Sequence, residues 1–248
     1  MIARFCAALR FLTVLPVPGH LGTEEQHLAR SLVFFPVVGV VIGCIMAVIA
    51  WLIWPFLPAL PAAAVMVFLM LAISGGFHLD GLADSADGML SARPREQILT
   101  IMRDSQIGSM GAAALVMVLL AKTVALGSLP QVQAASAVFL MPIAGRCLMV
   151  LMMAFLPYVR GEEGRAALFY QAASQEKKIV YITGGVLYSS SWYACGGSGL
   201  AAGAIALVAM LLFAWLCRVK IGGATGDTLG ATCELTEMVI VLILSAGW

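Results

Sequence analysis

Long apolar runs alternate with short polar connections along this chain. Seven runs approach the roughly 20 apolar residues that a helix needs to cross the hydrocarbon of a bilayer. They cover residues 32–54, 59–77, 107–129, 134–156, 179–193, 200–219 and, more weakly, 228–246. A transmembrane barrel would instead show segments of about ten residues with alternating polarity. The pattern therefore predicts an all-α, polytopic membrane helix bundle with about seven transmembrane helices.

Composition supports the same class of protein. Apolar residues make up 62% of the 248 residues and charged residues only 11%, whereas ordinary soluble domains are about a quarter charged. No linker or low-complexity stretch divides the chain, so we predict a single integral membrane domain over residues 1–248. We expect no cleavable signal peptide, because the short apolar stretch after Arg4 runs into Pro16, Pro18 and a charged segment before the first span.

The charges are distributed unequally between the two faces of the predicted bundle. All Lys and Arg residues except Lys122 and Arg146 lie in segments that the seven-span threading places on one face. The positive-inside rule makes that face cytoplasmic. We therefore expect a multi-pass protein of the bacterial inner (plasma) membrane, with its active site and catalytic loops at the cytoplasmic face.

Net charge argues against a nucleic-acid partner, and cysteine spacing argues against a disulfide framework. The formal net charge is +1 and no basic stripe is present, so a nucleic-acid partner is not expected. The six cysteines show neither CxxC pairs nor histidines at zinc spacing, and we interpret them as packing residues.

A cluster of three carboxylates interrupts the apolar background after the second span. Asp80, Asp84 and Asp87 lie in the string HLDGLADSADG, residues 78–88. On a helix, steps of four and three residues place the three side chains on one stripe. Like charges so placed destabilise one another unless a cation lies between them. Charges are rare in membrane proteins, so a metal site is favoured over a merely solvated polar connector.

A second acidic group precedes the last apolar run. Residues 222–237 contain Asp227, Glu234 and Glu237 after two glycines. The apolar sequence that follows is too short to cross alone, so the last span must include these turns. Glu234 would then lie about 10 Å deeper than Asp227 and face the bundle interior or a wet cavity. Asp227 either caps this helix or binds a metal, and the sequence leaves both readings open.

A third segment, residues 101–111, adds Asp104 beside Arg103 and a turn of small residues. Carboxylates, water and phosphate oxygens are the ligands that Mg²⁺ prefers. Bound Mg²⁺ neutralises a diphosphate and steadies its leaving group. The sequence therefore predicts Mg²⁺-dependent phosphoryl transfer at a membrane surface. The candidate metal ligands are Asp80, Asp84, Asp87, Asp104, Asp227 and Glu234.

Basic residues near these groups could bind phosphate. They are Arg10, Arg103, Arg146, Arg165, Arg218 and Lys220. Arg146 lies in mid-span, where a substrate or carboxylate partner is favoured over a purely structural pair between helices. Lys122 is nearer the far end of its span and is expected to snorkel. His78 is a ligand, a base or a hydrogen-bonded structural histidine.

Five motifs in this order resemble the cobalamin synthase family, adenosylcobinamide-GDP ribazoletransferase. They are residues 10–16, 78–88, 103–111, 157–160 and 222–237. The resemblance implies a Mg²⁺-dependent membrane enzyme that joins adenosylcobinamide-GDP to α-ribazole or its 5′-phosphate and releases GMP. These are the last steps of coenzyme B12 biosynthesis. One departure is Glu163-Gly164-Arg165, where a small-residue turn of glycines is expected.

The resemblance also implies roles for individual residues. The ribazole 5′-hydroxyl would attack the phosphorus nearer cobinamide, while Mg²⁺ is held on the diphosphate. The predicted catalytic residues are Asp84, Asp87 and Glu237, with Glu237 or Asp87 accepting the hydroxyl proton. The predicted substrate-binding residues are Arg10, His78, Arg103, Arg146 and Lys220.

Three other functions use similar residues. A CDP-alcohol phosphotransferase packs four aspartates into one longer helical run, and a prenyl-diphosphate transferase places two Asp-rich motifs on facing helices. A divalent-cation transporter would carry polar groups to the far side of the membrane, where this chain has almost none. The pattern leaves open the phosphorylation state of the acceptor, the number of metal ions and assembly into a homo-oligomer.

Overall fold

The computed structural model describes residues 1–161, 164, 166–175 and 178–247, and its regular elements are helices, as the sequence predicts. An isolated parallel bridge joins Tyr158 to Ala224. The helices are α1 (Ile2–Leu12), α2 (Glu25–Ala29), the 3₁₀ turn η1 (Leu32–Phe34), α3 (Phe35–Ile53), α4 (Ala59–Ser74), α5 (Phe77–Met89), α6 (Arg95–Ile101), α7 (Ser109–Gly127), α8 (Gln131–Phe155), α9 (Ala166–Gln175), α10 (Lys178–Ile221) and α11 (Gly226–Ser245).

The described residues form a multi-pass helical protein with fewer candidate spans than predicted. Five helical segments are long and apolar enough to cross a membrane, and a sixth arises if the bent pair α4 and α5 counts as one span. The predicted number is about seven; the difference arises because α4 and α5 are separated by a bend and because the kinked α10 is counted once. The predicted spans at 179–193 and 200–219 correspond to the two arms of α10, which join at a kink at Gly196.

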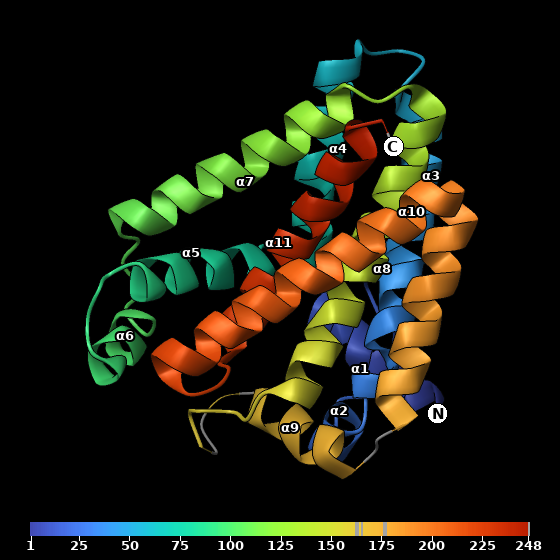
Figure 1. The fold of residues 1–248 in the computed structure, drawn as a ribbon. Helices are drawn as coiled ribbons and strands as arrows, with labels where there is room; N and C mark the ends of the chain where they lie inside the picture. Colours follow the sequence, from blue (N-terminus) through green and yellow to red (C-terminus); the bar gives the residue numbers. More distant parts are fainter. Residues whose placement is uncertain (162–163, 165, 176–177, 248) are drawn as a thin grey trace.

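Helix α10 is broken rather than straight. Gly196 has φ 57° and ψ −131°, outside the helical range, in a left-handed φ that favours glycine. Figure 1 shows the two arms of α10, drawn in orange, running in different directions. Each arm coincides with one of the two apolar runs that hydropathy predicted.

Helix α8 forms the centre of the bundle. Most of its side chains between Ala134 and Met153 are buried, as expected for a helix that is apolar all round. Helix α3 packs directly on it through Gly39 and Gly43, where an added Cβ would lie 2.8 Å from the Pro142 carbonyl oxygen and 2.3 Å from that of Phe139. Small residues allow such close helix packing in membranes.

A sharp bend sets the acidic helix across the bundle. Gly75 and Gly76 both have positive φ, 64° and 72°, and the chain turns by 93° between α4 and α5. The second predicted span therefore ends before its predicted limit, and α5 becomes a separate element. Figure 1 shows α5 lying across the direction of α4.

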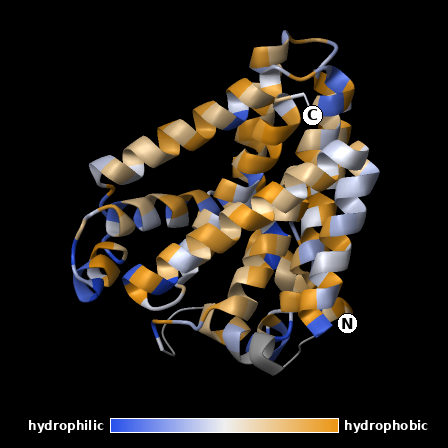
Figure 2. Ribbon diagram, viewed as in Figure 1, coloured by the Kyte–Doolittle hydropathy of each residue, from blue (hydrophilic) through white to orange (hydrophobic). Residues whose placement is uncertain are grey.

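The outer helices present apolar side chains outward. Val116, Met117 and Leu120 of α7 and Leu212 and Trp215 of α10 are all more than half exposed. Figure 2 shows hydrophobic colouring along α7, whereas hydrophilic residues gather around α6 and its flanking turns. A surface of this kind suits a lipid environment.

Candidate active site

The two acidic segments meet where α5 packs on the start of α11. A Cβ added to Gly81 would lie 2.7 Å from the Asp227 carbonyl oxygen, and one added to Gly230 would lie 3.0 Å from that of His78. These glycines let the two backbones touch. Asp84 of α5 is half-buried and feels the negative charges of Asp227 and Asp80. The structure thus joins acidic groups separated by more than a hundred residues.

Arg160 is the cation at this junction. Its Nη2 lies 2.7 Å from Asp227 Oδ2 and also donates to the Met102 carbonyl oxygen at 3.3 Å. Its Nε is buried without a hydrogen-bond partner among the described residues. Sequence reasoning placed Arg160 within a motif but did not select it as a site residue.

The backbone around Arg160 is held by a short bridge to the α10–α11 turn. Val159 N–H donates to the Ala224 carbonyl oxygen at 3.0 Å, and Ala224 N–H donates to that of Pro157 at 2.8 Å. A Cβ on Gly223 would lie 2.2 Å from the Pro157 oxygen, so only glycine fits there. The bridge brings Arg160 to the first turn of α11.

Asp87, the third carboxylate of the α5 stripe, binds the start of α7. Gly108 N–H donates to Asp87 Oδ2 and Gly111 N–H donates to Oδ1, each at 2.8 Å. A Cβ at either glycine would lie 2.3 Å from the carboxylate. A negative charge is stabilised at a helix N-terminus by unpaired N–H groups and the helix dipole. Both Asp87 oxygens are therefore engaged in positioning α7.

Thr225, not Asp227, caps α11. Thr228 N–H donates to Thr225 Oγ1 at 3.2 Å, and Thr225 N–H donates to Thr228 Oγ1 at 2.9 Å, which completes a capping box. The Asp227 carboxylate lies in the first turn and pairs with Arg160. Of the two readings that the sequence left open for Asp227, capping is thus excluded by the Thr225 contacts.

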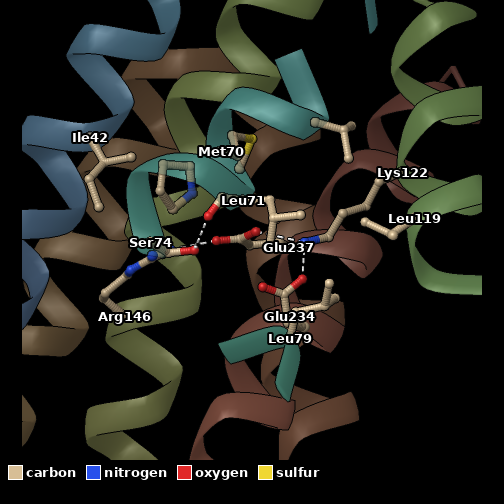
Figure 3. Close-up of a pocket in the computed structure, with 12 residues that line it drawn as sticks. Ile42, Met70, Leu71, Ser74, Leu79, Leu119, Lys122, Arg146, Glu234 and Glu237 are labelled. Carbon is tan, nitrogen blue, oxygen red and sulfur yellow. Dashed lines mark hydrogen bonds and ion pairs between the residues drawn. The ribbon is translucent and has the colours of Figure 1, made fainter. Parts of the chain in front are cut away.

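Glu234 and Glu237 take part in a buried ionic network with Lys122 and Arg146 (Figure 3). Lys122 Nζ lies 2.7 Å from Glu234 Oε2 and 2.7 Å from Glu237 Oε2, and Arg146 Nη1 lies 2.5 Å from Glu237 Oε1. All four residues are at most 6% exposed. Two cations balance two anions, as a buried network requires. The cavity beside them, about 10 Å³, has room for about one water.

This network corrects the expectation for Lys122 and identifies the partner of Arg146. Lys122 does not snorkel; its side chain is buried and neutralises two carboxylates whose sequence positions are 112 and 115 residues away. Arg146 has a carboxylate partner, Glu237, which was one of the partners considered for it. Hydropathy along the chain could not reveal these pairs, because they form between α7, α8 and α11.

His78 links the network to the acidic helix. Its Nδ1 lies 3.4 Å from Arg146 Nη2. A guanidinium group can only donate, so Nδ1 accepts and the neutral ring carries its proton on Nε2. His78 is buried, and Nε2 has no partner in the described part of the chain.

The remaining predicted residues lie in other local contacts. Arg10 donates to the carbonyl oxygens of Val17, Gly19 and Leu21 and so holds the loop after α1. Lys220 Nζ donates to the Met89 carbonyl oxygen at 2.6 Å and ties α10 to the end of α5.

The turn between α6 and α7 contains two more predicted residues. Asp104 Oδ1 accepts a hydrogen bond from Gln106 N–H at 3.0 Å, and Arg103 is exposed beside it. The predictions for Glu163 and Arg165 fall outside the described residues.

The side chains of the described residues form no ready-made metal centre. Among the described residues, no three His, Cys, Asp or Glu side chains lie close enough to hold one ion together. The junction instead offers carboxylates on two elements, with one arginine beside them.

Fold and site define a multi-pass helical membrane protein in which a transverse acidic helix meets a glycine-rich helix start. Residues 4–245 match the family described as CobS, cobalamin-5-phosphate synthase. The chain belongs to this family, as its motifs imply.

Individual relatives agree with the family match. The chain is 41% identical to an adenosylcobinamide-GDP ribazoletransferase of Klebsiella pneumoniae over 248 residues, which cover 98% of this chain and 100% of the relative. It is 38% identical over 251 residues to a protein of the same description from Chlorobaculum parvum, covering 100% of this chain and 96% of the relative. No solved structure matches the chain.

Proposed function

We propose that the chain transfers the adenosylcobinamide phosphate group from adenosylcobinamide-GDP to α-ribazole, or to its 5′-phosphate, and releases GMP. The full-length similarity to ribazoletransferases supports this reaction. It also decides against the CDP-alcohol phosphotransferase, the prenyl-diphosphate transferase and the cation transporter. The observation that carries the assignment of the site is the close contact of α5 with the first turns of α11, which brings the Asp84 helix beside Asp227 and its partner Arg160.

The chemistry of these side chains fits Mg²⁺. Asp84 feels the negative charges of Asp227 and Asp80, while Arg160 is paired with Asp227, so a divalent cation at the junction would relieve the repulsion. Mg²⁺ is commonly held by one or two carboxylates, several waters and substrate phosphates, and so needs no preformed protein cage. We place Mg²⁺ on Asp84 and Asp227, where it would neutralise the substrate diphosphate.

Arg160 supplies the cationic side of the proposed diphosphate site. Its ion pair with Asp227 uses only part of its fork of five N–H donors, and its Nε is buried without a partner in the described residues. A phosphate oxygen would satisfy that donor with a charge-assisted hydrogen bond.

Asp80 is the best candidate to accept the proton of the attacking hydroxyl. Both oxygens of Glu237 are in ion pairs, and both oxygens of Asp87 accept backbone hydrogen bonds. Asp80 is exposed and lines the cavity beside the junction. The 5′-oxygen of ribazole would bond to the phosphorus nearer cobinamide as that phosphorus parts from the GMP oxygen, and the hydroxyl proton would pass to Asp80.

The orientation of the site is part of the proposal. The one-sided distribution of Lys and Arg supports a cytoplasmic location for the α5–α11 junction and an inner-membrane location for the protein.

Product analysis tests the reaction directly. Purified protein is given adenosylcobinamide-GDP, α-ribazole and Mg²⁺, and the products are separated by chromatography. We expect adenosylcobalamin and GMP in equal amounts, with no product when Mg²⁺ is chelated. Absence of product, or turnover of a CDP-alcohol in place of the corrinoid, would refute the proposed function.

A further inference from the structure

A cavity of about 220 Å³ lies beside the acidic junction, and the proposed diphosphate site does not use its apolar part. Residues of α1, α5, α8, α9 and α11 line it. Its apolar wall includes Phe11, Phe77, Met149, Met153 and Phe169. Asp80, Asp227, Arg160 and His78 of the site described above also line it. An apolar cavity with a few convergent polar groups is typical of a small-molecule binding site.

Three phenylalanines give the cavity an aromatic wall. The ring centroid of Phe11 lies 5.5 Å from that of Phe77, in an edge arrangement, and 4.9 Å from that of Phe169. Phe169 is fully buried and packs in turn on Phe35 at 5.1 Å. Tilted and edge-on rings at these distances are the favoured geometries for aromatic contacts. The wall is therefore built before any ligand arrives.

The volume of the cavity decides which part of the two substrates can fit into it. A dry cavity of about 150 Å³ lined by aliphatic and aromatic side chains is known to bind benzene. A volume of about 220 Å³ suits a bicyclic aromatic ring. A corrin macrocycle is several times larger and does not fit.

His78 does not present a polar group to the cavity. Its Nδ1 is turned to Arg146, and its Nε2 is buried from solvent and has no partner within the described residues. The cavity therefore offers its occupant apolar contact and shape rather than a hydrogen bond from this histidine.

We propose that this cavity binds the bicyclic aromatic base of the ribazole acceptor against its apolar wall. The inference rests on the proposed function, which supplies the acceptor. It also places the attached ribose beside Asp80 and Asp227, because both carboxylates line the same cavity. Binding of the base thus orients the 5′-hydroxyl toward the diphosphate site.

A substitution that fills the cavity tests whether the aromatic base binds there. Ala166 lines it and is half-buried, so Ala166→Leu adds three carbon atoms to its volume. Ala154 of α8 is exposed and next to the lining residue Met153, so Ala154→Leu is a matched control. Binding of α-ribazole alone is measured by calorimetry on the full chain in detergent with Mg²⁺, and KM is measured for each substrate.

We expect Ala166→Leu to weaken α-ribazole binding and to raise its KM by at least tenfold, while the KM for adenosylcobinamide-GDP stays within twofold. Ala154→Leu should match the wild type. An unchanged KM and affinity for α-ribazole in Ala166→Leu would overturn the proposal, and so would a rise confined to the KM for adenosylcobinamide-GDP.

The two proposals fail in different ways. Wild-type protein that binds α-ribazole but forms no adenosylcobalamin contradicts the proposed function and leaves the cavity assignment standing. Active protein whose Ala166→Leu variant handles α-ribazole normally contradicts the cavity assignment alone.

Discussion

At the scale of single residues, the acidic side chains fall into two groups, according to whether their oxygens already have partners within the protein. Asp87 binds backbone N–H groups, and Glu234 and Glu237 bind buried cations. Asp80 and Asp84 show neither kind of contact among the described residues. Asp84, together with Asp227 across the junction, is therefore available for the metal, and Asp80 is available for the substrate.

This division predicts opposite results for two identical substitutions in α5. Asp84→Asn removes a proposed Mg²⁺ ligand and should reduce transfer by at least a thousandfold, with the protein still folded in detergent. Asp87→Asn keeps an oxygen for the start of α7, because asparagine also caps helices well, and should retain at least a tenth of the activity. Transfer rates and size-exclusion profiles decide the comparison. Near-normal activity of Asp84→Asn would contradict the metal assignment.

Asp80→Asn separates proton transfer from metal binding. We expect kcat to fall by at least a hundredfold, the usual range for loss of a general base, while the Mg²⁺ concentration for half-maximal activity is unchanged. Steady-state kinetics across a Mg²⁺ titration measures both. A large rise in the Mg²⁺ requirement would assign Asp80 to the metal instead.

Glu237→Gln tests the buried network by stability. The change leaves Lys122 and Arg146 with one carboxylate between them in an apolar core, which should cost about 3–5 kcal/mol of the free energy of unfolding. Glu25→Gln, at an exposed position, should cost almost nothing. Thermal unfolding in detergent compares them. Equal unfolding temperatures would show that the network does not stabilise the fold.

At the scale of elements, glycines decide how closely α5 approaches its neighbours. Hydropathy predicted a span at 59–77 and an acidic stretch after it, but the 93° turn at Gly75 and Gly76 depends on backbone angles that an apolar run does not encode. The contact of Gly81 with the Asp227 backbone likewise depends on the packing of α5 on α11.

Gly81→Ala should push α5 away from α11, because its Cβ would lie 2.7 Å from the Asp227 carbonyl oxygen. Separating Asp84 from Asp227 should raise the Mg²⁺ concentration for half-maximal activity by about tenfold, since an ångström-scale displacement disrupts a catalytic geometry. Gly185→Ala is the control, because a Cβ there meets open space. Identical Mg²⁺ requirements in the two variants would show that the helix contact does not set the site.

At the scale of the whole molecule, the proposed site must face one side of the membrane. The turn between α6 and α7 adjoins the acidic junction, whereas the turn between α7 and α8 lies at the other end of α7, a candidate span. The orientation proposed above from charge asymmetry places the first turn in the cytoplasm.

Cysteine labelling tests this orientation. In a variant without the native cysteines, Ser105→Cys and Ser128→Cys place one thiol in each turn, both at exposed positions. A membrane-impermeant maleimide added outside intact spheroplasts should label the thiol at 128 and leave that at 105 unlabelled until the cells are lysed. The reverse pattern would place the site on the outer face.

The sequence by itself determined the helical class, the membrane environment, the family and the acidic segments that form the site. Each of these depends on local composition, apolar periodicity or contiguous motifs. Only the tertiary structure decided that α5 turns across the bundle, that Lys122 is buried among carboxylates and that Arg160 joins the site. It also decided which carboxylates are free. The physical reason is that side chains are neutralised, capped or left available by partners up to 115 residues away, and packing alone brings those partners together.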